Sequence, residues 1–160
     1  MNPPSKVLIL CTGNSARSII GEYLLRVKSK GRFEVYSAGA KPIGRVNPLA
    51  LWVLQQHYGI DASDARSKSW DELRTVPFDF VITVCDHAKE TCPAWPGKPV
   101  VAHWSSPDPA GAEGTVEQHK QRFVQVASQI ARRVDLFCAF PDDKLQSAAA
   151  HVGQQFGLSQ

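Results

Sequence analysis

Residues 7–25, VLILCTGNSARSIIGEYLL, decide the fold of this chain. The apolar run 7–10 predicts a short buried strand, and apolar side chains recur at helical spacing from Ile19 to Val27. A polar loop that begins with Cys11 joins these two elements. In a strand, loop and helix unit, the backbone amides of the loop point inward at the positive end of the helix, where anions bind. We therefore predict an oxyanion site with the Cys11 thiolate at its rim.

Strand and helix patterns alternate along the rest of the chain. Further strands are expected at residues 33–37, 78–84 and 99–103, helices at 48–58, 70–73 and 116–137, and loops at 85–97 and 105–111. Asn47 before Pro48, and a capping box of Thr115 with Gln118, mark two of the helix starts. This alternation indicates parallel βαβ units. The predicted fold is α/β, a single domain with a doubly wound four-stranded parallel sheet flanked by helices.

Three chemistry-bearing segments directly follow predicted strands. Cys11 follows the first strand, Cys85 follows the strand at 78–84, and the loop 105–111 follows the strand at 99–103. Sheets of this kind bind ligands beyond the carboxyl ends of their strands. We therefore expect these three segments to share one edge of the sheet.

The last part of the chain differs from the rest. After Pro141 one face of a final helix carries Leu145, Ala149, Val152 and Phe156, and Gly157 ends it. We divide the chain into a domain at 1–137 and a helical extension at 138–160. The extension either packs on its own domain or forms an interface with a second chain, so both a monomer and a homodimer stay open.

Composition excludes several classes of function. The chain has 160 residues, enough for one domain with its own core, and a net charge of +3 without a run of like charge, which argues against nucleic acid. No stretch approaches the ~20 apolar residues of a membrane helix, and the N-terminus leads into a strand. We expect a cytoplasmic protein whose four cysteines stay reduced, with catalytic, metal-binding or buried roles.

The opening loop has the residue types that bind a tetrahedral oxyanion. Gly13 permits backbone angles that let amides converge on the oxygens, and Arg17 offers a planar fork of donors. The hydroxyls of Ser15 and Ser18 can donate to the thiolate or to the loop backbone. A thiolate held in this way is a nucleophile. The predicted oxyanion-binding residues are Thr12, Gly13, Asn14, Ser15, Ala16, Arg17 and Ser18.

The loop CTGNSARS at 11–18 resembles the phosphate-binding loop of low-molecular-weight protein tyrosine phosphatases. It is still more similar to that of the thioredoxin-coupled arsenate reductases built on the same fold. The resemblance continues through YSAG at 36–39, VNP at 46–48 and HWSSPDPAG at 103–111, and covers roughly residues 5–137. It implies a low-molecular-weight tyrosine phosphatase-like fold.

The resemblance to the reductases also implies a mechanism. Cys11 would attack arsenate, Asp108 would protonate the leaving oxygen, and Cys85 and Cys92 would relay two electrons by forming disulfides. An external dithiol, thioredoxin or a glutaredoxin with glutathione, would restore the thiols. No cofactor is expected, and a zinc site at Cys85, His87 and Cys92 lacks the spacing of metal ligands.

Two alternatives stay open from the sequence. A phosphatase would use only Cys11, Arg17 and Asp108, whereas a non-catalytic regulator would bind an oxyanion or arsenite through its thiols. Ala110 stands where the similar phosphatases have an aromatic residue that helps to hold an aryl substrate, and this favours a small inorganic oxyanion.

Some of the similar reductases bind potassium near the loop. Asn14, Glu22 and Ser37 match their ligands, but Ser69 occupies the place of the aspartate, so no metal is expected.

Overall fold

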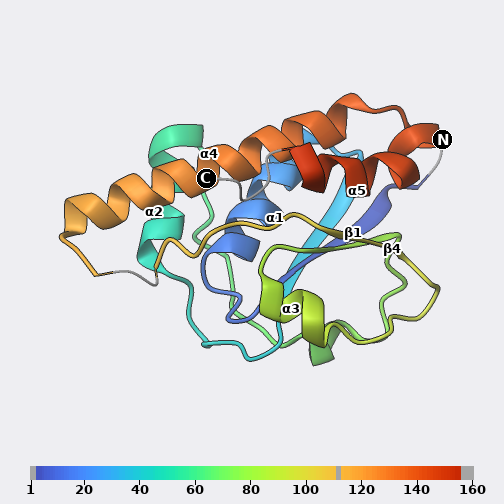
Figure 1. Ribbon diagram of the computed structural model, residues 1–160, viewed down its shortest axis with the longest axis horizontal. Coiled ribbons are helices and arrows are strands. Elements are labelled where there is room, and N and C mark those ends of the chain that lie inside the picture. Colours follow the sequence, from blue (N-terminus) through green and yellow to red (C-terminus); the bar gives the residue numbers. More distant parts are fainter. Residues whose placement is uncertain (1–2, 111–112, 156–160) are drawn as a thin grey trace.

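A four-stranded parallel sheet forms the centre of the computed structural model, which describes residues 3–110 and 113–155 (Figure 1). Its strands run in the order β2-β1-β3-β4. Their bounds are Ser5–Cys11 for β1, Phe33–Gly39 for β2, Phe80–Thr83 for β3 and Val100–His103 for β4. The predicted α/β fold with a parallel sheet is confirmed.

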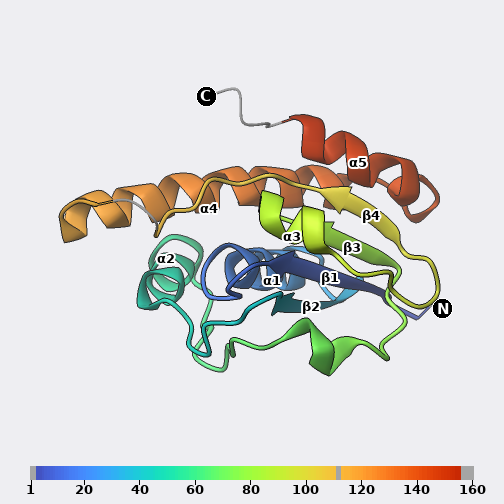
Figure 2. The same cartoon turned by 60° about the horizontal axis from the view of Figure 1, so that its bottom comes forward.

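Helices flank this sheet and complete one continuous core. They are α1 (Arg17–Lys28), α2 (Pro48–Tyr58), α3 (Asp86–Thr91), α4 (Val116–Ala139) and α5 (Leu145–Gln155), with short 3₁₀ turns at Trp70–Leu73 and Asp142–Lys144. Helix α1 packs against α4, α2 and β2, and α5 packs against α4 and β4. Figure 2 shows α4 crossing the molecule along one side, with α5 next to its C-terminal half.

Helix starts and ends follow the local signals in the sequence. The Asn47 side chain accepts a hydrogen bond from the amide of Leu49, and Gly59 ends α2 with a left-handed φ of 65°. The capping box of Thr115 with Gln118 is present at the start of α4. Helix α4 ends at Ala139, just beyond the predicted division at residue 137.

Helix α5 packs on its own domain. Leu145, Ala149 and Val152 are buried, as the apolar face predicts, while Phe156 and Gly157 lie outside the described residues. Because β4 and α4 cover this face within the same chain, its burial needs no second copy.

The prediction of a loop throughout 85–97 is wrong, because α3 occupies its first half. The segment Asp86–Thr91 contains neither Gly nor Pro, Asp86 supplies a negative charge at the helix N-terminus, and Ala88 is fully buried. Pro93 and Pro96 then prevent the helix from continuing. Cys85 and Cys92 are therefore the two residues that cap a short helix.

The carboxyl ends of β1, β3 and β4 meet at one edge, as predicted. The amide of Val84 donates to the carbonyl of Leu10, and the amide of Ser106 donates to the carbonyl of Val84. These bonds extend the parallel ladder past the strands and place the segments after Cys11, Val84 and Trp104 next to one another.

Among the helices of the described residues, none is both long enough and apolar enough to span a membrane.

A substitution at Gly39 probes how tightly the loop after β1 is packed. A β-carbon at this position would lie 2.5 Å from the backbone oxygen of Thr12, which cannot move without displacing the loop. We expect Gly39→Ala to lower the free energy of unfolding by about 1–3 kcal/mol and to weaken phosphate binding. Urea unfolding and calorimetric titration with phosphate measure the two effects.

Gly31→Ala is the matched control. Gly31 has a φ of 85°, but a β-carbon there meets nothing within 4 Å. This variant should lose stability through backbone strain alone and bind phosphate like the wild type. Equal phosphate binding by Gly39→Ala and the wild type would contradict the proposed packing role of Gly39.

Candidate active site

Cys11 lies at the bottom of the loop that joins β1 to α1, with only 3% of the residue exposed. The amide of Asn14 donates to the Cys11 sulfur at 3.3 Å, and the Ser18 hydroxyl lies 2.9 Å from the same sulfur. The N-terminus of α1 begins at Arg17, immediately above. Hydrogen-bond donors and a helix N-terminus both favour a thiolate at this position.

Asn14 supports the loop from below. Its side-chain amide nitrogen donates to Ser18 at 2.8 Å and to Ser37 at 3.0 Å, and its oxygen accepts the amide of Lys68 at 2.9 Å. Asn14, and not Gly13, has the left-handed backbone, with a φ of 46°. The expectation that Gly13 supplies special backbone angles is wrong, because Asn tolerates this conformation when its side chain is hydrogen-bonded.

A cavity of about 290 Å³ opens above the sulfur. It brings together Cys11, Arg17 and Asp108, three of the five predicted catalytic residues. Asn14 and Ser18, by contrast, are fully buried and do not line it. The cavity is lined by Cys11, Thr12, Gly13, Ser15, Ala16, Arg17, Lys41, Ile43, Asn47, Asp108 and Ala110.

The segment 40–47 forms a second wall that the sequence did not indicate. The amides of Lys41, Ile43 and Asn47 donate to the carbonyls of Thr12, Gly13 and Ser15 at 2.9–3.0 Å. These bonds place Lys41 at the cavity, where its charge adds to that of Arg17. Only this tertiary backbone pairing brings Lys41 to the site, so no pattern in the sequence could reveal it.

The segment 105–110, called the acid loop because it carries Asp108, also lines the cavity. Asp108 itself is exposed. The Asp108 carboxylate accepts the amide of Ala110 at 2.9 Å, a bond that fixes its side chain relative to the loop. Arg17 donates to the carbonyl of Ser106 at 3.0 Å. Arg17 therefore connects the oxyanion loop to the loop that holds Asp108.

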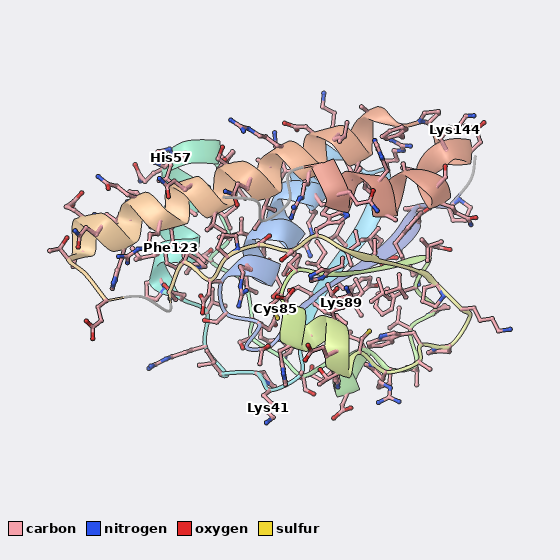
Figure 3. The ribbon with its side chains drawn as sticks, viewed as in Figure 1. Lys41, His57, Cys85, Lys89, Phe123 and Lys144 are labelled. Carbon is pink, nitrogen blue, oxygen red and sulfur yellow. The ribbon has the colours of Figure 1, made fainter. Side chains whose placement is uncertain are left out.

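Cys85 lies where β3 gives way to α3 (Figure 3). It is buried, and its sulfur is 3.2 Å from the hydroxyl of Thr12, the residue next to Cys11. Cys92 is half-buried at the other end of α3, and burial raises the pKa of its thiol. Cys85 and Cys92 are seven positions apart, and at a rise of 1.5 Å per residue their Cα atoms lie about 10 Å apart along the helix. A disulfide needs roughly 4.4–6.8 Å between Cα atoms. A bond between them requires α3 to unwind.

The His103 side chain connects α3 to the sheet. One ring nitrogen lies 2.8 Å from the hydroxyl of Thr83 on β3, and the other lies 2.9 Å from the carboxylate of Asp86 at the start of α3. This pairing depends on the register of β3 with β4, so no local pattern in the sequence indicates it. The neighbouring Trp104 is buried.

The residues that match a potassium site do not fit the ion. The Glu22 carboxylate is buried, and its two oxygens accept hydrogen bonds from Ser37 and from the guanidinium of Arg26. The Asn14 oxygen is taken by a backbone amide, and the Ser69 hydroxyl accepts the amide of Asp71. The guanidinium of Arg26 already neutralises the Glu22 carboxylate, the charged ligand that a potassium ion would need.

Substitutions of Ser15 and Ser18 test whether the Ser18 hydroxyl stabilises the Cys11 thiolate. Ser18→Ala removes the hydroxyl 2.9 Å from Cys11 and should slow alkylation of Cys11 by iodoacetamide at neutral pH about ten-fold, because the thiolate loses a donor. Ser15→Ala is the control, since no hydrogen bond of the Ser15 side chain is found within the described residues. Equal alkylation rates in the two variants would argue against a role for Ser18.

Comparison with known proteins now identifies the family. Residues 6–106 match the model of the low molecular weight phosphotyrosine protein phosphatase family. The chain is 38% identical over 131 residues to an arsenate reductase of Halalkalibacterium halodurans, a match that covers 82% of this chain and 93% of that protein. An arsenate reductase of Bacillus subtilis is 35% identical over 131 residues, with the same shares covered.

Solved structures agree. An arsenate reductase in a phosphate-binding state superposes with a TM-score of 0.72 at 27% identity, covering 84% of this chain and 97% of that one. A thioredoxin-dependent arsenate reductase of Corynebacterium glutamicum gives a TM-score of 0.59 at 28% identity, covering 84% of this chain and 64% of that one. The chain therefore belongs to the low molecular weight phosphotyrosine protein phosphatase family and, within it, to the group that contains these arsenate reductases.

Proposed function

We propose that this protein is an arsenate reductase that works through a disulfide relay of Cys11, Cys85 and Cys92. The observation that carries the proposal is the placement of Cys85, whose sulfur lies 3.2 Å from the hydroxyl of the residue next to Cys11. A phosphatase has no use for a second thiol there. The names of the relatives support the same activity.

The first step uses the cavity above Cys11. Arg17, Lys41 and the loop amides hold the arsenate oxygens, and the Cys11 thiolate attacks arsenic. A sulfur–arsenic bond forms and one arsenic–oxygen bond breaks. Protonated Asp108 donates its proton, and the oxygen leaves as water.

The second step transfers the electrons. The Cys85 thiolate attacks the Cys11 sulfur, the sulfur–arsenic bond breaks, and its electron pair stays with arsenic. As(V) becomes As(III) and leaves as arsenite, while the two thiols are oxidised to a Cys11–Cys85 disulfide. Cys92 then attacks Cys85, which frees the Cys11 thiolate and leaves a Cys85–Cys92 disulfide.

The last exchange needs a conformational change. Helix α3 keeps Cys85 and Cys92 too far apart, and burial raises the pKa of the Cys92 thiol, so Cys92 is a poor nucleophile while the helix is intact. Unwinding α3 frees the segment to bend, so that the two sulfurs can meet, and it exposes Cys92 to water. It also breaks the contact of Asp86 with His103.

The partner that closes the cycle is an external dithiol. The likeness to a thioredoxin-dependent arsenate reductase favours thioredoxin, and a glutaredoxin with glutathione is the alternative donor. The proposed compartment is the cytoplasm, where cysteines stay reduced between cycles. The division into a domain at 1–137 and an extension at 138–160, and the choice between monomer and homodimer, remain predictions.

Phosphate-ester hydrolysis is a second candidate activity of the same cavity. Cys11, Arg17 and Asp108 line it together and suffice for a phosphatase. A low molecular weight protein tyrosine phosphatase from T. tengcongensis superposes with a TM-score of 0.63 at 25% identity, covering 82% of this chain and 98% of that one. This activity would not depend on Cys85.

The relay is tested by arsenate-dependent oxidation of NADPH in the presence of thioredoxin and its reductase. Cys85→Ser and Cys92→Ser should each lose at least a hundred-fold in steady-state turnover, because the disulfide cannot be passed on. In quenched-flow experiments Cys92→Ser should still release one equivalent of arsenite, whereas Cys85→Ser should release none.

Cys138→Ser is the matched control, because Cys138 is a half-buried cysteine near the end of α4 and should not affect turnover. Unimpaired reduction by Cys85→Ser would exclude the relay. Hydrolysis of p-nitrophenyl phosphate without any arsenate reduction would favour the phosphatase.

Oxidation should unwind α3. In the protein with a Cys85–Cys92 disulfide, the amides of residues 86–91 should exchange with deuterium at least ten-fold faster than in the reduced protein. The exchange of the amides in α2, which no redox step involves, provides the internal reference. Unchanged protection of 86–91 on oxidation would mean that the disulfide forms without loss of the helix.

A further inference from the structure

The corner between β4 and the acid loop is held by the C-terminal part of the chain. The indole nitrogen of the buried Trp104 donates to the carbonyl of Ala149 on α5 at 2.9 Å. The Trp104 ring also packs edge-on against Phe137 of α4, with 5.4 Å between ring centroids. Trp104 is four residues before Asp108, and these contacts come entirely from residues beyond the family match, which ends at residue 106.

Gly153 brings the backbone of α5 against this corner. A β-carbon at Gly153 would lie 2.2 Å from the carbonyl oxygen of His103 and 3.0 Å from the Trp104 ring. Glycine costs roughly 1 kcal/mol in a helix interior relative to alanine. Its presence here is explained by the close approach of α5 to the peptide that leads into the acid loop.

A buried arginine completes the contact. Arg133 of α4 is 1% exposed, and burial lowers the pKa of its guanidinium. Its two terminal nitrogens donate to the carbonyls of Ser105 and Gly153. One guanidinium therefore connects α4, α5 and the first residue after Trp104.

We propose that α5, through Gly153 and Ala149 and together with Arg133, is a positioning element for the general acid Asp108. This inference rests on the proposed function, in which Asp108 protonates the leaving oxygen. The hydrogen bonds end at Trp104 and Ser105, and the adjacent Ser106 carbonyl accepts from Arg17. Displacement of this corner therefore moves Asp108 relative to the oxyanion that Arg17 holds.

Positioning and stability make different predictions. If the general acid is displaced by about 1 Å, kcat falls. The loop amides bind the oxyanion whatever the position of Asp108, so KM stays nearly unchanged. A positioning residue that acts through Asp108 has no effect once Asp108 cannot donate a proton. A residue that only stabilises the fold affects both backgrounds alike.

The experiment is a double-mutant cycle in the full-length protein. Gly153→Ala and Trp104→Phe are each combined with Asp108→Asn, and the rate of arsenate reduction is measured with thioredoxin and its reductase. Each single variant should lower kcat about ten-fold with KM nearly unchanged, and neither should lower the rate further in the Asp108→Asn background. Trp104→Phe keeps an aromatic ring against Phe137, removes the hydrogen bond to Ala149 and leaves a small cavity. It makes no clash with α5, so it tests the proposal even where Gly153→Ala fails to fold.

Gln146→Gly is the matched control. Gln146 is an exposed residue of the same helix, so this change weakens α5 without contact to residues 103–105 and should leave kcat unchanged at temperatures where the protein is folded. Equal rate losses in the wild-type and Asp108→Asn backgrounds would overturn the proposal. A kcat loss in Gln146→Gly as large as in Trp104→Phe would overturn it as well.

Failure of the proposed function gives a different result. If the wild type reduces no arsenate, the same cycle is measured on hydrolysis of p-nitrophenyl phosphate, which uses the same loop and the same acid. Loss of the Trp104→Phe effect in the Asp108→Asn background supports the positioning role for either reaction. If Asp108→Asn slows neither reaction, the role of α5 falls together with that of Asp108.

Discussion

The hydrogen bonds of Asn14 hold the loop on which the rest of the site depends. Asn14 is fully buried, and its backbone amide and side chain together reach Cys11, Ser18, Ser37 and the amide of Lys68. A buried polar group is stable only when its donors and acceptors are satisfied, so the left-handed backbone at Asn14 is retained because four partners converge on it. Strand β2 supplies one of them, which makes the shape of the loop a property of the sheet.

The second constraint is the distance that helix α3 imposes between Cys85 and Cys92, the two cysteines at its ends. In the proposed relay Cys85 has to lie close to Cys11 to form a disulfide with it, and α3 begins there because Asp86 and Ala88 favour a helix. The helix then holds Cys92 away from Cys85. In the proposed relay this separation orders the steps, because Cys92 becomes reactive only after the segment opens.

Much of the fold was predictable because its signals are local. The buried run 7–10, the helical spacing after residue 18 and the caps at Asn47 and Thr115 each act within one element. Placing Cys11, Cys85 and the acid loop at one edge needed only the rule for parallel sheets.

The missed features arise where segments far apart in the chain meet. Helix α3 is too short for a periodic pattern, and Lys41 reaches the cavity through backbone bonds to the loop. His103 finds Asp86 through the strand register, and Arg133 has the sequence context of an exposed charge although it is buried between two helices. No local pattern distinguishes such residues from ordinary surface positions.

The capping of α3 by two cysteines has a consequence for the encounter with the electron donor. In the proposed cycle the donor attacks the Cys85–Cys92 disulfide, and such an attack needs an accessible sulfur. In the structure the segment between the two cysteines is a helix and Cys85 is buried, so on this proposal the reduced protein would not compete with the oxidised form for the donor. The helical state of this segment would then report the redox state, and the donor would be released when the helix reforms.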